Sequence, residues 1–224
     1  QFQEKIKSFY ATIKNKWAIK FLLITGVTKT KNSSVFSGTD INDITNYSPY
    51  SQMIGFTRDE IKKYYIDYLK LASSYENSCS VDNVTDEQIE SLLDRLAKNY
   101  DGYCFDEDYE KKVFSTWSVN KFFQTMVGKK KVQFGEYWYD NGGLPSILVN
   151  YLKTHELNIF EYLDKDKFLK VSSDDFKNPT ALTTINQNVL MCQTGYLTLR
   201  SDLNKTSTVA LGIPNGEIYK ALNR

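Results

Sequence analysis

"IKFLLITGVTKTK", residues 19–31, is the stretch of sequence on which the fold assignment depends. Its first part, "IKFLLITG", is a short apolar run between polar residues, which is typical of a strand buried on both faces of a parallel sheet. Residues 2–17 place apolar side chains at helical spacing with lysines on the other face, so we expect an amphipathic helix there. A helix followed by a buried strand predicts the last part of an α/β unit.

Polar residues follow the point where the predicted strand ends. In open α/β sheets, ligands bind beyond the carboxyl ends of the strands, because loop amides and polar side chains converge there. The hydroxyls of Thr25 and Thr28 could orient a water molecule or a phosphate oxygen, and the ammonium of Lys29 could offset phosphate charge. From composition alone we favour the simpler interpretation, in which Thr25 ends the strand and Lys29 is solvated.

The composition excludes several classes of protein. The chain has 224 residues, 41% of them hydrophobic, which is enough for a packed core in one large or two small domains. The net charge of +1 provides no global attraction to nucleic acid or to a membrane, and no apolar run approaches the roughly 20 residues of a membrane span. A single histidine, His155, argues against histidine-based triads and multi-histidine metal sites. Three isolated cysteines lack the spacing of a zinc site or a disulfide framework, so we expect a reducing, cytoplasmic setting.

The character of the sequence changes near residue 56, where two helix-start signals begin a helical region. Thr57 with Glu60, and Thr85 with Gln88, form the capping-box pattern, and each box is flanked by an apolar pair that can act as a hydrophobic staple. We therefore expect one helix from each box and a loop around residues 73–83. The first helix is expected to carry on its inner face Ile61, Tyr64, Tyr65, Tyr68 and Leu69.

The remaining segments continue this helical pattern and end in two strands. "TWSVNKFFQTM", residues 116–126, has an amphipathic pattern, and Pro145 occupies a favourable position in the first turn of another helix. Residues 183–193 predict a helix that Gly195 ends, followed by strand-like runs in "YLTLR" and "STVALGI". A helix followed by a hairpin is the wing end of a winged-helix unit. In the earlier polar region, "INDIT" at residues 41–45 could form a short second strand.

The motifs of phosphate and nuclease chemistry are absent or weak. A P-loop requires G-x-x-x-x-G-K-S/T, which this sequence lacks, and its predicted buried strand ends in Thr25 rather than in an acidic magnesium ligand. By itself the chain is therefore expected not to hydrolyse ATP. The charged runs at residues 110–112 and 164–166 contain the residue types of a metal-dependent nuclease, but neither lies in an apolar strand pattern. We interpret both as solvated charge clusters.

Ordered blocks along nearly the whole chain resemble a family of bacterial AAA-ATPase-like domains. The first block, "KFLLITGVTKTKNSSVFSGTDINDIT", resembles the family pattern of I-T-G-V-S/T-K, then S-I/V-F-S-G, then N-D-I-T. Further blocks follow in the family's order: "GFTRDEI", "NYDGYCF", "EYWYDNGGLPSIL", and "LMCQTGYLTL" with "LGIPNGE". Members of this family often carry a PD-(D/E)XK nuclease-like domain at the C-terminus.

The resemblance implies an α/β P-loop NTPase remnant in residues 1–55, containing the sensor strand. Residues 56–224 would then form a mainly helical lid region that ends in a winged-helix-like helix and hairpin. The P-loop half would lie before Gln1, and the nuclease-like domain would lie after Arg224. Thr25 would stand near the γ-phosphate with Thr28 and Lys29 just beyond it, and ATP with Mg²⁺ would be cofactors only of the intact module.

The resemblance implies that such a module couples ATP binding or hydrolysis to an effector domain. The alternative is a degenerate ATPase fold that serves as a non-catalytic module for binding protein or DNA. Direct nucleic-acid binding through the wing is a weaker third interpretation, and no membrane partner is expected.

Overall fold

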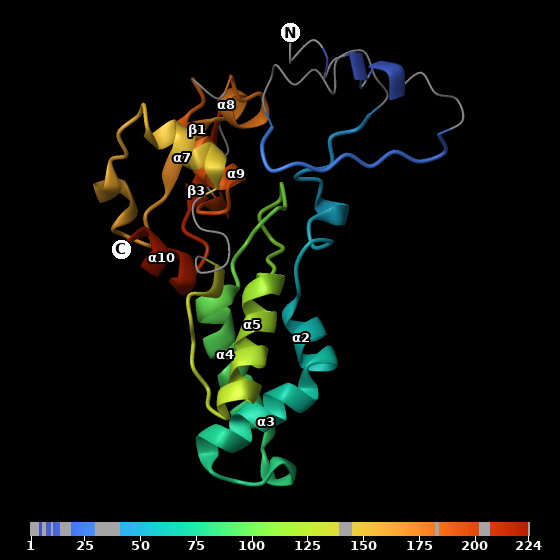
Figure 1. Cartoon of the computed structure of the whole chain (residues 1–224), viewed down its shortest axis with the longest axis vertical. Helices are drawn as coiled ribbons and strands as arrows, with labels where there is room; N and C mark the ends of the chain where they lie inside the picture. The colour runs from blue at the N-terminus through green and yellow to red at the C-terminus, as the bar shows by residue number, and fades with distance from the viewer. Residues whose placement is uncertain are drawn as a thin grey trace.

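The computed structural model describes residues 5, 8–9, 11–13, 19–29, 41–138, 145–181, 184–201 and 207–223. Figure 1 shows a group of helices at one end of the molecule and a mixed helix and strand unit next to it. The two units have separate apolar cores. One is built from buried side chains within residues 61–100 and 114–126, and the other from Tyr103, Cys104, Val113 and buried side chains within residues 148–218. The region from residue 56 onward therefore contains two packed units.

The helical unit begins at the predicted capping boxes, both of which are confirmed. Thr57 caps α2 (Arg58–Tyr64) and Thr85 caps α4 (Asp86–Tyr100), with both reciprocal bonds of the capping box present in each case. Each box stabilises its helix by about 1 kcal/mol, because it satisfies two amides that lack intrahelical partners. α5 (Thr116–Lys129) forms where the third amphipathic segment was predicted, and it packs with α3 and α4.

The first predicted helix is wrong in two respects. The chain forms two helices, α2 and α3 (Ile66–Asn77), which meet at Tyr65, where φ is −112° and ψ is 18°. This break changes the phase of the helical pattern, so Tyr64 and Tyr68 are 68% and 46% exposed while Ile61 and Leu69 are fully buried. The predicted loop around 73–83 is also mostly ordered, because α3 continues to Asn77 and the short 3-10 helix η3 (Val81–Asn83) follows.

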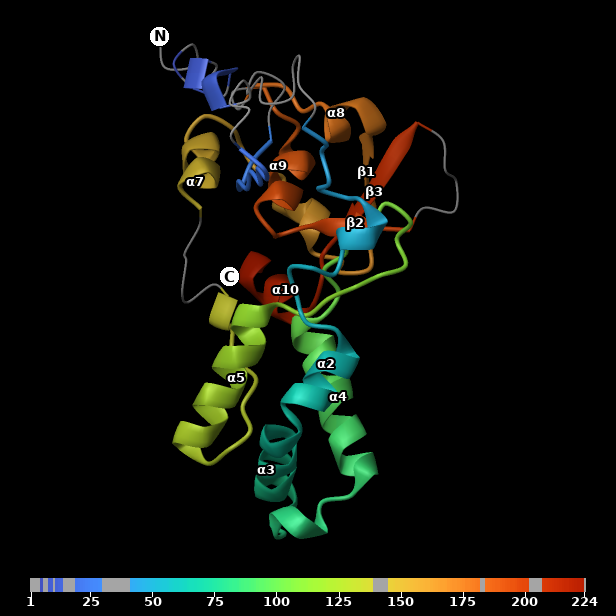
Figure 2. The ribbon, with the colours of Figure 1, turned by 90° about the vertical axis from the view of Figure 1, so that its right-hand side faces the viewer.

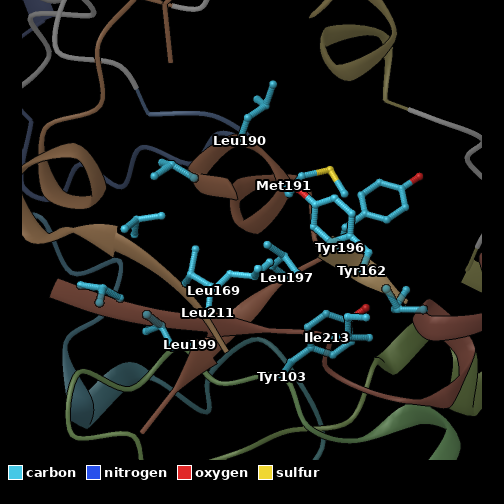
Figure 3. Packing of buried hydrophobic residues seen from close by; sticks show 14 of the residues in the cluster. Tyr103, Tyr162, Leu169, Leu190, Met191, Tyr196, Leu197, Leu199, Leu211 and Ile213 are labelled. Atoms are coloured by element: carbon cyan, nitrogen blue, oxygen red, sulfur yellow. The ribbon is translucent and has the colours of Figure 1, made fainter. Parts of the chain in front are cut away.

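The second unit contains a three-stranded antiparallel sheet. The predicted hairpin is confirmed as β2 (Thr198–Arg200) and β3 (Thr208–Gly212), and β1 (Leu169–Ser172) pairs with the other edge of β3. The helices of this unit are α7 (Ser146–Leu152), η4 (Ile159–Tyr162), α8 (Ser173–Lys177), α9 (Gln187–Gln193) and α10 (Gly216–Leu222). Figure 3 shows Leu190 and Met191 of α9 on one side of this sheet's buried side chains, including Leu169 and Leu211.

The loop after α4 and the loop before α10 contact each other where the helical unit meets the second unit. α10 lies at the ends of α4 and α5 in both views, and its contacts with α4 are direct (Figure 1, Figure 2). Gly102, which ends α4 as predicted, has φ +99°, and a Cβ there would lie 2.2 Å from the carbonyl oxygen of Pro214. Asn215 donates its side-chain amide to the carbonyl of Asp101 at 3.0 Å. The "YDGY" and "IPNGE" segments therefore meet as packed connecting loops.

The strand predicted in "IKFLLITG" is not formed. Residues 19–29 have no strand pairing, and residues 41–45 are also irregular. A parallel strand requires neighbours on which to pair, and the described part of the chain places no strand beside residues 19–29. Of the predicted helix over 2–17, the described residues 5, 8–9 and 11–13 are helical, and the rest of that prediction lies outside the described residues.

Among the described residues, no helix combines the length and the apolar character needed to cross a lipid bilayer.

Candidate functional site

The segment that carries Thr25, Thr28 and Lys29 is attached to the end of α9. The amide of Lys29 donates to Oε1 of Gln193 at 3.1 Å, and Nε2 of Gln193 donates to the carbonyl of Lys29 at 3.0 Å. One side-chain amide thus satisfies both backbone groups of Lys29, as a neighbouring strand would. This contact joins two segments that are 164 residues apart in sequence.

The side chain of Lys29 makes an ion pair with Asp43. The Asp43 carboxylate also accepts from the amide and hydroxyl of Thr45, at 3.0 and 2.6 Å. Partial burial alone would raise the pKa of Asp43, but the bonds from Lys29 and Thr45 outweigh it and hold the pKa below its ordinary value. Asp43 is therefore the ionised partner of Lys29, and the pair fixes the 19–29 segment to the 41–45 segment.

The three predicted site residues are not joined to one another by hydrogen bonds in the described part of the chain. Thr25 is exposed, whereas Thr28 and Lys29 are partly buried. In the described part of the chain, the hydroxyls of Thr25 and Thr28 make no hydrogen bond. The structure thus leaves the Thr25 hydroxyl accessible to solvent and places the Lys29 ammonium against a carboxylate.

The apolar side chains before Thr25 face solvent to an unusual degree. Phe21 is 81% exposed, Leu23 is 53% exposed and Val27 is 67% exposed, with Ile19 and Leu22 also exposed. Single exposed apolar residues are ordinary on protein surfaces, whereas several of them along one segment form an apolar surface of the kind that interaction sites have. This run is the strongest functional signal that the residues themselves provide.

The loop at residues 106–111 lies next to Asn46, three residues after Asp43, and is held by backbone hydrogen bonds. The amide of Glu107 donates to the carbonyl of Asn46 at 2.9 Å. Asp106 is fully buried, and its carboxylate accepts from the amides of Asp108, Glu110 and Lys111 at 3.0–3.2 Å. Burial alone would raise the pKa of Asp106, but the hydrogen bonds outweigh it and hold the pKa below its ordinary value. Asp106 therefore organises the 106–111 loop through backbone amides.

The charged runs at residues 110–112 and 164–166 do not form a metal site in the described residues. The Lys111 ammonium donates to the carbonyl and the hydroxyl of Ser48 at 3.0 and 3.1 Å, and residues 164–166 form an exposed turn. In the portion of the chain described above, no three histidine, cysteine, aspartate or glutamate side chains are grouped so as to hold a metal ion.

The contacts of Thr25 and Lys29 bear on whether these residues fit ATP and Mg²⁺. The exposed Thr25 hydroxyl is compatible with a phosphate oxygen. The Lys29 ammonium, in contrast, is already paired with Asp43. Among the described residues, Thr25 and Thr28 thus keep unbonded hydroxyls, whereas Lys29 is engaged by Asp43 and Gln193.

Sequence reasoning missed Gln193 and Glu217 as polar side chains that join distant segments. Glu217 of α10 is 1% exposed, and its two carboxylate oxygens accept from the Ser118 hydroxyl at 2.7 Å and from the amide of Trp138 at 2.8 Å. The sequence offered no specific signal, because α9 and α10 carry other polar side chains, Gln187, Asn188 and Lys220, beside Gln193 and Glu217.

Comparison with known proteins identifies no relative: no family model, no curated protein and no solved structure matches this chain.

Proposed function

We propose that this chain is the sensor-and-lid half of an AAA-ATPase-like module that couples ATP binding or hydrolysis to an effector domain. Residues 19–25 would insert as the sensor strand into the sheet of a P-loop core, and Thr25 would stand at the carboxyl end of that strand. The proposal keeps the division into an α/β part over 1–55 and a lid and winged-helix-like part over 56–224.

The observation that carries this proposal is the exposed apolar run at residues 19–27. Phe21, Leu23 and Val27 are mostly exposed, although a strand with this composition is normally covered on both faces. The run has no regular secondary structure, bends at Lys20 and Val27, and pairs with no described strand. In the proposal its backbone groups pair with neighbouring strands of the core sheet. These are the properties of a strand whose sheet is supplied by another part of the protein.

The contacts of Lys29 support a mechanical role for the segment. Gln193 holds its backbone and Asp43 holds its side chain, so a displacement of the strand is transmitted directly to α9 and to the 41–45 segment. In this proposal the Thr25 hydroxyl orients a phosphate oxygen or the attacking water. Its displacement on a change of nucleotide shifts the helical units between two arrangements.

The order of elements in the second unit supports its winged-helix-like part. A helix, a strand, two helices and a hairpin follow one another as α7, β1, α8, α9, β2 and β3, and β3 lies between β1 and β2. In DNA-binding proteins of the helix-turn-helix type, the second helix presents exposed side chains to the major groove. α9 occupies the corresponding place, but it contains no lysine or arginine and none of its residues is exposed. This unit therefore favours a role in attaching the 19–29 segment over DNA binding through α9.

ATP hydrolysis by the protein as its gene encodes it tests the proposal. We expect Thr25→Val to lower turnover by about 10- to 1,000-fold, because the loss of one positioned transition-state contact has effects of this size. Thr180→Val, which changes an exposed threonine of the second unit, is the matched control and should leave turnover intact. Equal turnover in the Thr25 variant and the control would remove Thr25 from the mechanism.

A non-catalytic protein-binding module is the second candidate, and the same exposed apolar run favours it. In that case the run covers a partner surface without any nucleotide. Absence of ATP binding to the encoded protein, together with an upstream sequence that lacks a P-loop, would select this candidate.

A further inference from the structure

A cleft between the helical unit and the second unit is lined by basic side chains. Its volume is about 730 Å³, within the range of roughly 300–1,000 Å³ that is usual for sites of small ligands. α4 forms one wall, α10 forms another, and the 163–166 turn closes one side. The basic residues that line it are Arg95, Lys98, Lys165 and Lys220.

Three of these cations are not bonded to a protein carboxylate. In the described part of the chain, Lys98, Lys165 and Lys220 make no ion pair and no side-chain hydrogen bond. Arg95 differs, because its guanidinium binds Glu76 through two nitrogen atoms, one at 2.7 Å. The lining thus carries three ammonium groups without a bonded counter-ion, from three separate segments of the chain, and two carboxylates. Such a group of like charges is stabilised by an anion.

The cleft also has an apolar wall. Phe134, Leu163 and Tyr219 line it, and the Tyr219 hydroxyl is held by the carbonyl of Leu163 at 3.0 Å. The ring of Phe134 lies 5.6 Å from the Arg95 guanidinium carbon, which fixes that side of the wall. A ligand with a planar apolar part and an anionic part therefore matches the lining.

Acidic groups limit the size of the anion. Asp164 and Asp166 line the same cleft, and one Asp164 oxygen accepts from the amide of Asp166 at 3.0 Å. Glu76 lies beside Arg95. A nucleic-acid strand needs a basic path that continues past the cleft, whereas these carboxylates border it. The lining suits a compact anion better than a long polyanion.

From this lining we infer that the cleft binds a phosphorylated small molecule of nucleoside-diphosphate size. Lys98, Lys165 and Lys220 contact the phosphates, and the planar base lies along the wall of Phe134 and Tyr219. This site uses none of the residues at Thr25, so the inference does not rest on the function proposed above. A null result for Thr25→Val turnover would leave it untouched.

Calorimetric titration of the 224-residue chain with ADP tests the inference, with pyrophosphate as the second probe. We expect ADP to bind with Kd on the order of 0.1 mM and pyrophosphate to bind at least several-fold more weakly, because pyrophosphate lacks the base. The variant Lys98→Gln with Lys220→Gln should weaken ADP binding by about 100-fold, since each lysine provides a charge-assisted contact.

The control is Lys129→Gln with Lys131→Gln, which removes the same charge from exposed lysines outside the cleft. Lys129 lies in the last turn of α5, as Lys98 and Lys220 lie in the last turns of α4 and α10, so helix-end effects are matched. Circular dichroism melting of each variant identifies any loss of folding, and the single variant Lys165→Gln, on a turn, provides a measurement that is independent of the helices.

No heat with ADP at millimolar concentration would overturn the inference, as would equal ADP affinity in the Lys98 and Lys220 variant and its control. Equal affinity for ADP and pyrophosphate would overturn the assignment of the base to the aromatic wall.

Discussion

Replacement of Glu217 should weaken the contact between the helical unit and the second unit. Glu217 lies in the first turn of α10 and is almost completely buried. Its carboxylate accepts from the Ser118 hydroxyl at 2.7 Å and from the Trp138 amide at 2.8 Å. Glu217→Ala removes the acceptor of the partly buried Trp138 amide, which costs about 1–3 kcal/mol, whereas the Ser118 hydroxyl keeps Ser115 Oγ at 3.0 Å as an acceptor.

Part of this cost is offset because the buried carboxylate is itself unfavourable. Burial raises the pKa of Glu217, although bonds from Ser118, Trp138 and Tyr137 act in the other direction. The folded protein therefore holds a proton on Glu217 at a pH where the unfolded chain has lost it. We expect Glu217→Ala to lower the free energy of unfolding by about 1–3 kcal/mol at neutral pH.

Glu217→Gln separates the hydrogen bonds from the charge. Its amide oxygen can accept from Trp138 and its NH2 group can donate to Ser118, so we expect a change within about 1 kcal/mol at pH 7. The stability that the neutral carboxyl contributes is complete below the ordinary glutamate pKa and is lost as pH rises through the raised pKa of the folded state. The free energy of unfolding of Glu217→Gln should therefore rise relative to that of the wild type as the pH increases from acidic to neutral.

Urea unfolding at acidic and neutral pH, followed by circular dichroism, measures both effects. If the free energy of unfolding of Glu217→Ala lay within about 0.5 kcal/mol of the wild-type value at pH 7, the buried bonds would contribute nothing measurable and the reasoning would be refuted. If the difference in free energy of unfolding between the wild type and Glu217→Gln did not change with pH, only the claim that burial raises the pKa of Glu217 would be refuted.

Two further variants test the helix caps and the attachment of the 19–29 segment. Thr85→Ala removes the cap of α4 and should lower the free energy of unfolding by about 1 kcal/mol in urea, while an unchanged unfolding midpoint would contradict the capping assignment. Gln193→Ala removes both bonds to the Lys29 backbone and should speed amide hydrogen exchange in residues 26–29 by about tenfold or more, with α4 unaffected as the internal control. Unchanged exchange in the variant would show that the Gln193 contact does not hold the segment.

Local signals in the sequence predicted several elements correctly. The two capping boxes are complete in the sequence itself, because residues three positions apart supply both bonds. The β2–β3 hairpin was likewise visible as two strand-like runs separated by a polar turn. Gly195 was predicted to end α9, and its φ of +85° explains why a glycine is needed there. These features depend on neighbours in sequence, which a linear pattern can show.

Features that depend on distant neighbours were not predicted. β1 has only the alternation of Leu169 and Val171 within a charged region, and its pairing with β3 joins segments 40 or so residues apart. The break at Tyr65 is a backbone feature that changes which tyrosines face the core. The same limit explains the 19–27 run, since its composition indicates a buried strand but the neighbours that would bury it are not specified by the run itself.

The pairing of Lys29 shows why the candidate site was only partly predictable. The pattern placed Thr25, Thr28 and Lys29 together at one strand end. In the structure the Lys29 ammonium binds Asp43, and the Lys29 backbone binds Gln193 from a helix 164 residues away. A sequence reveals which residues can carry charge or hydrogen bonds, but the fold decides which of them are already paired.

An experimental structure of the encoded protein with a non-hydrolysable ATP analogue and Mg²⁺ would be the most direct test of the central proposal. We expect residues 19–25 to form a central strand with Phe21 and Leu23 buried. The Thr25 hydroxyl should then lie within hydrogen-bonding distance of the γ-phosphate or of the water that attacks it. A nucleotide bound elsewhere, with the apolar run still exposed and Thr25 in solvent, would contradict it.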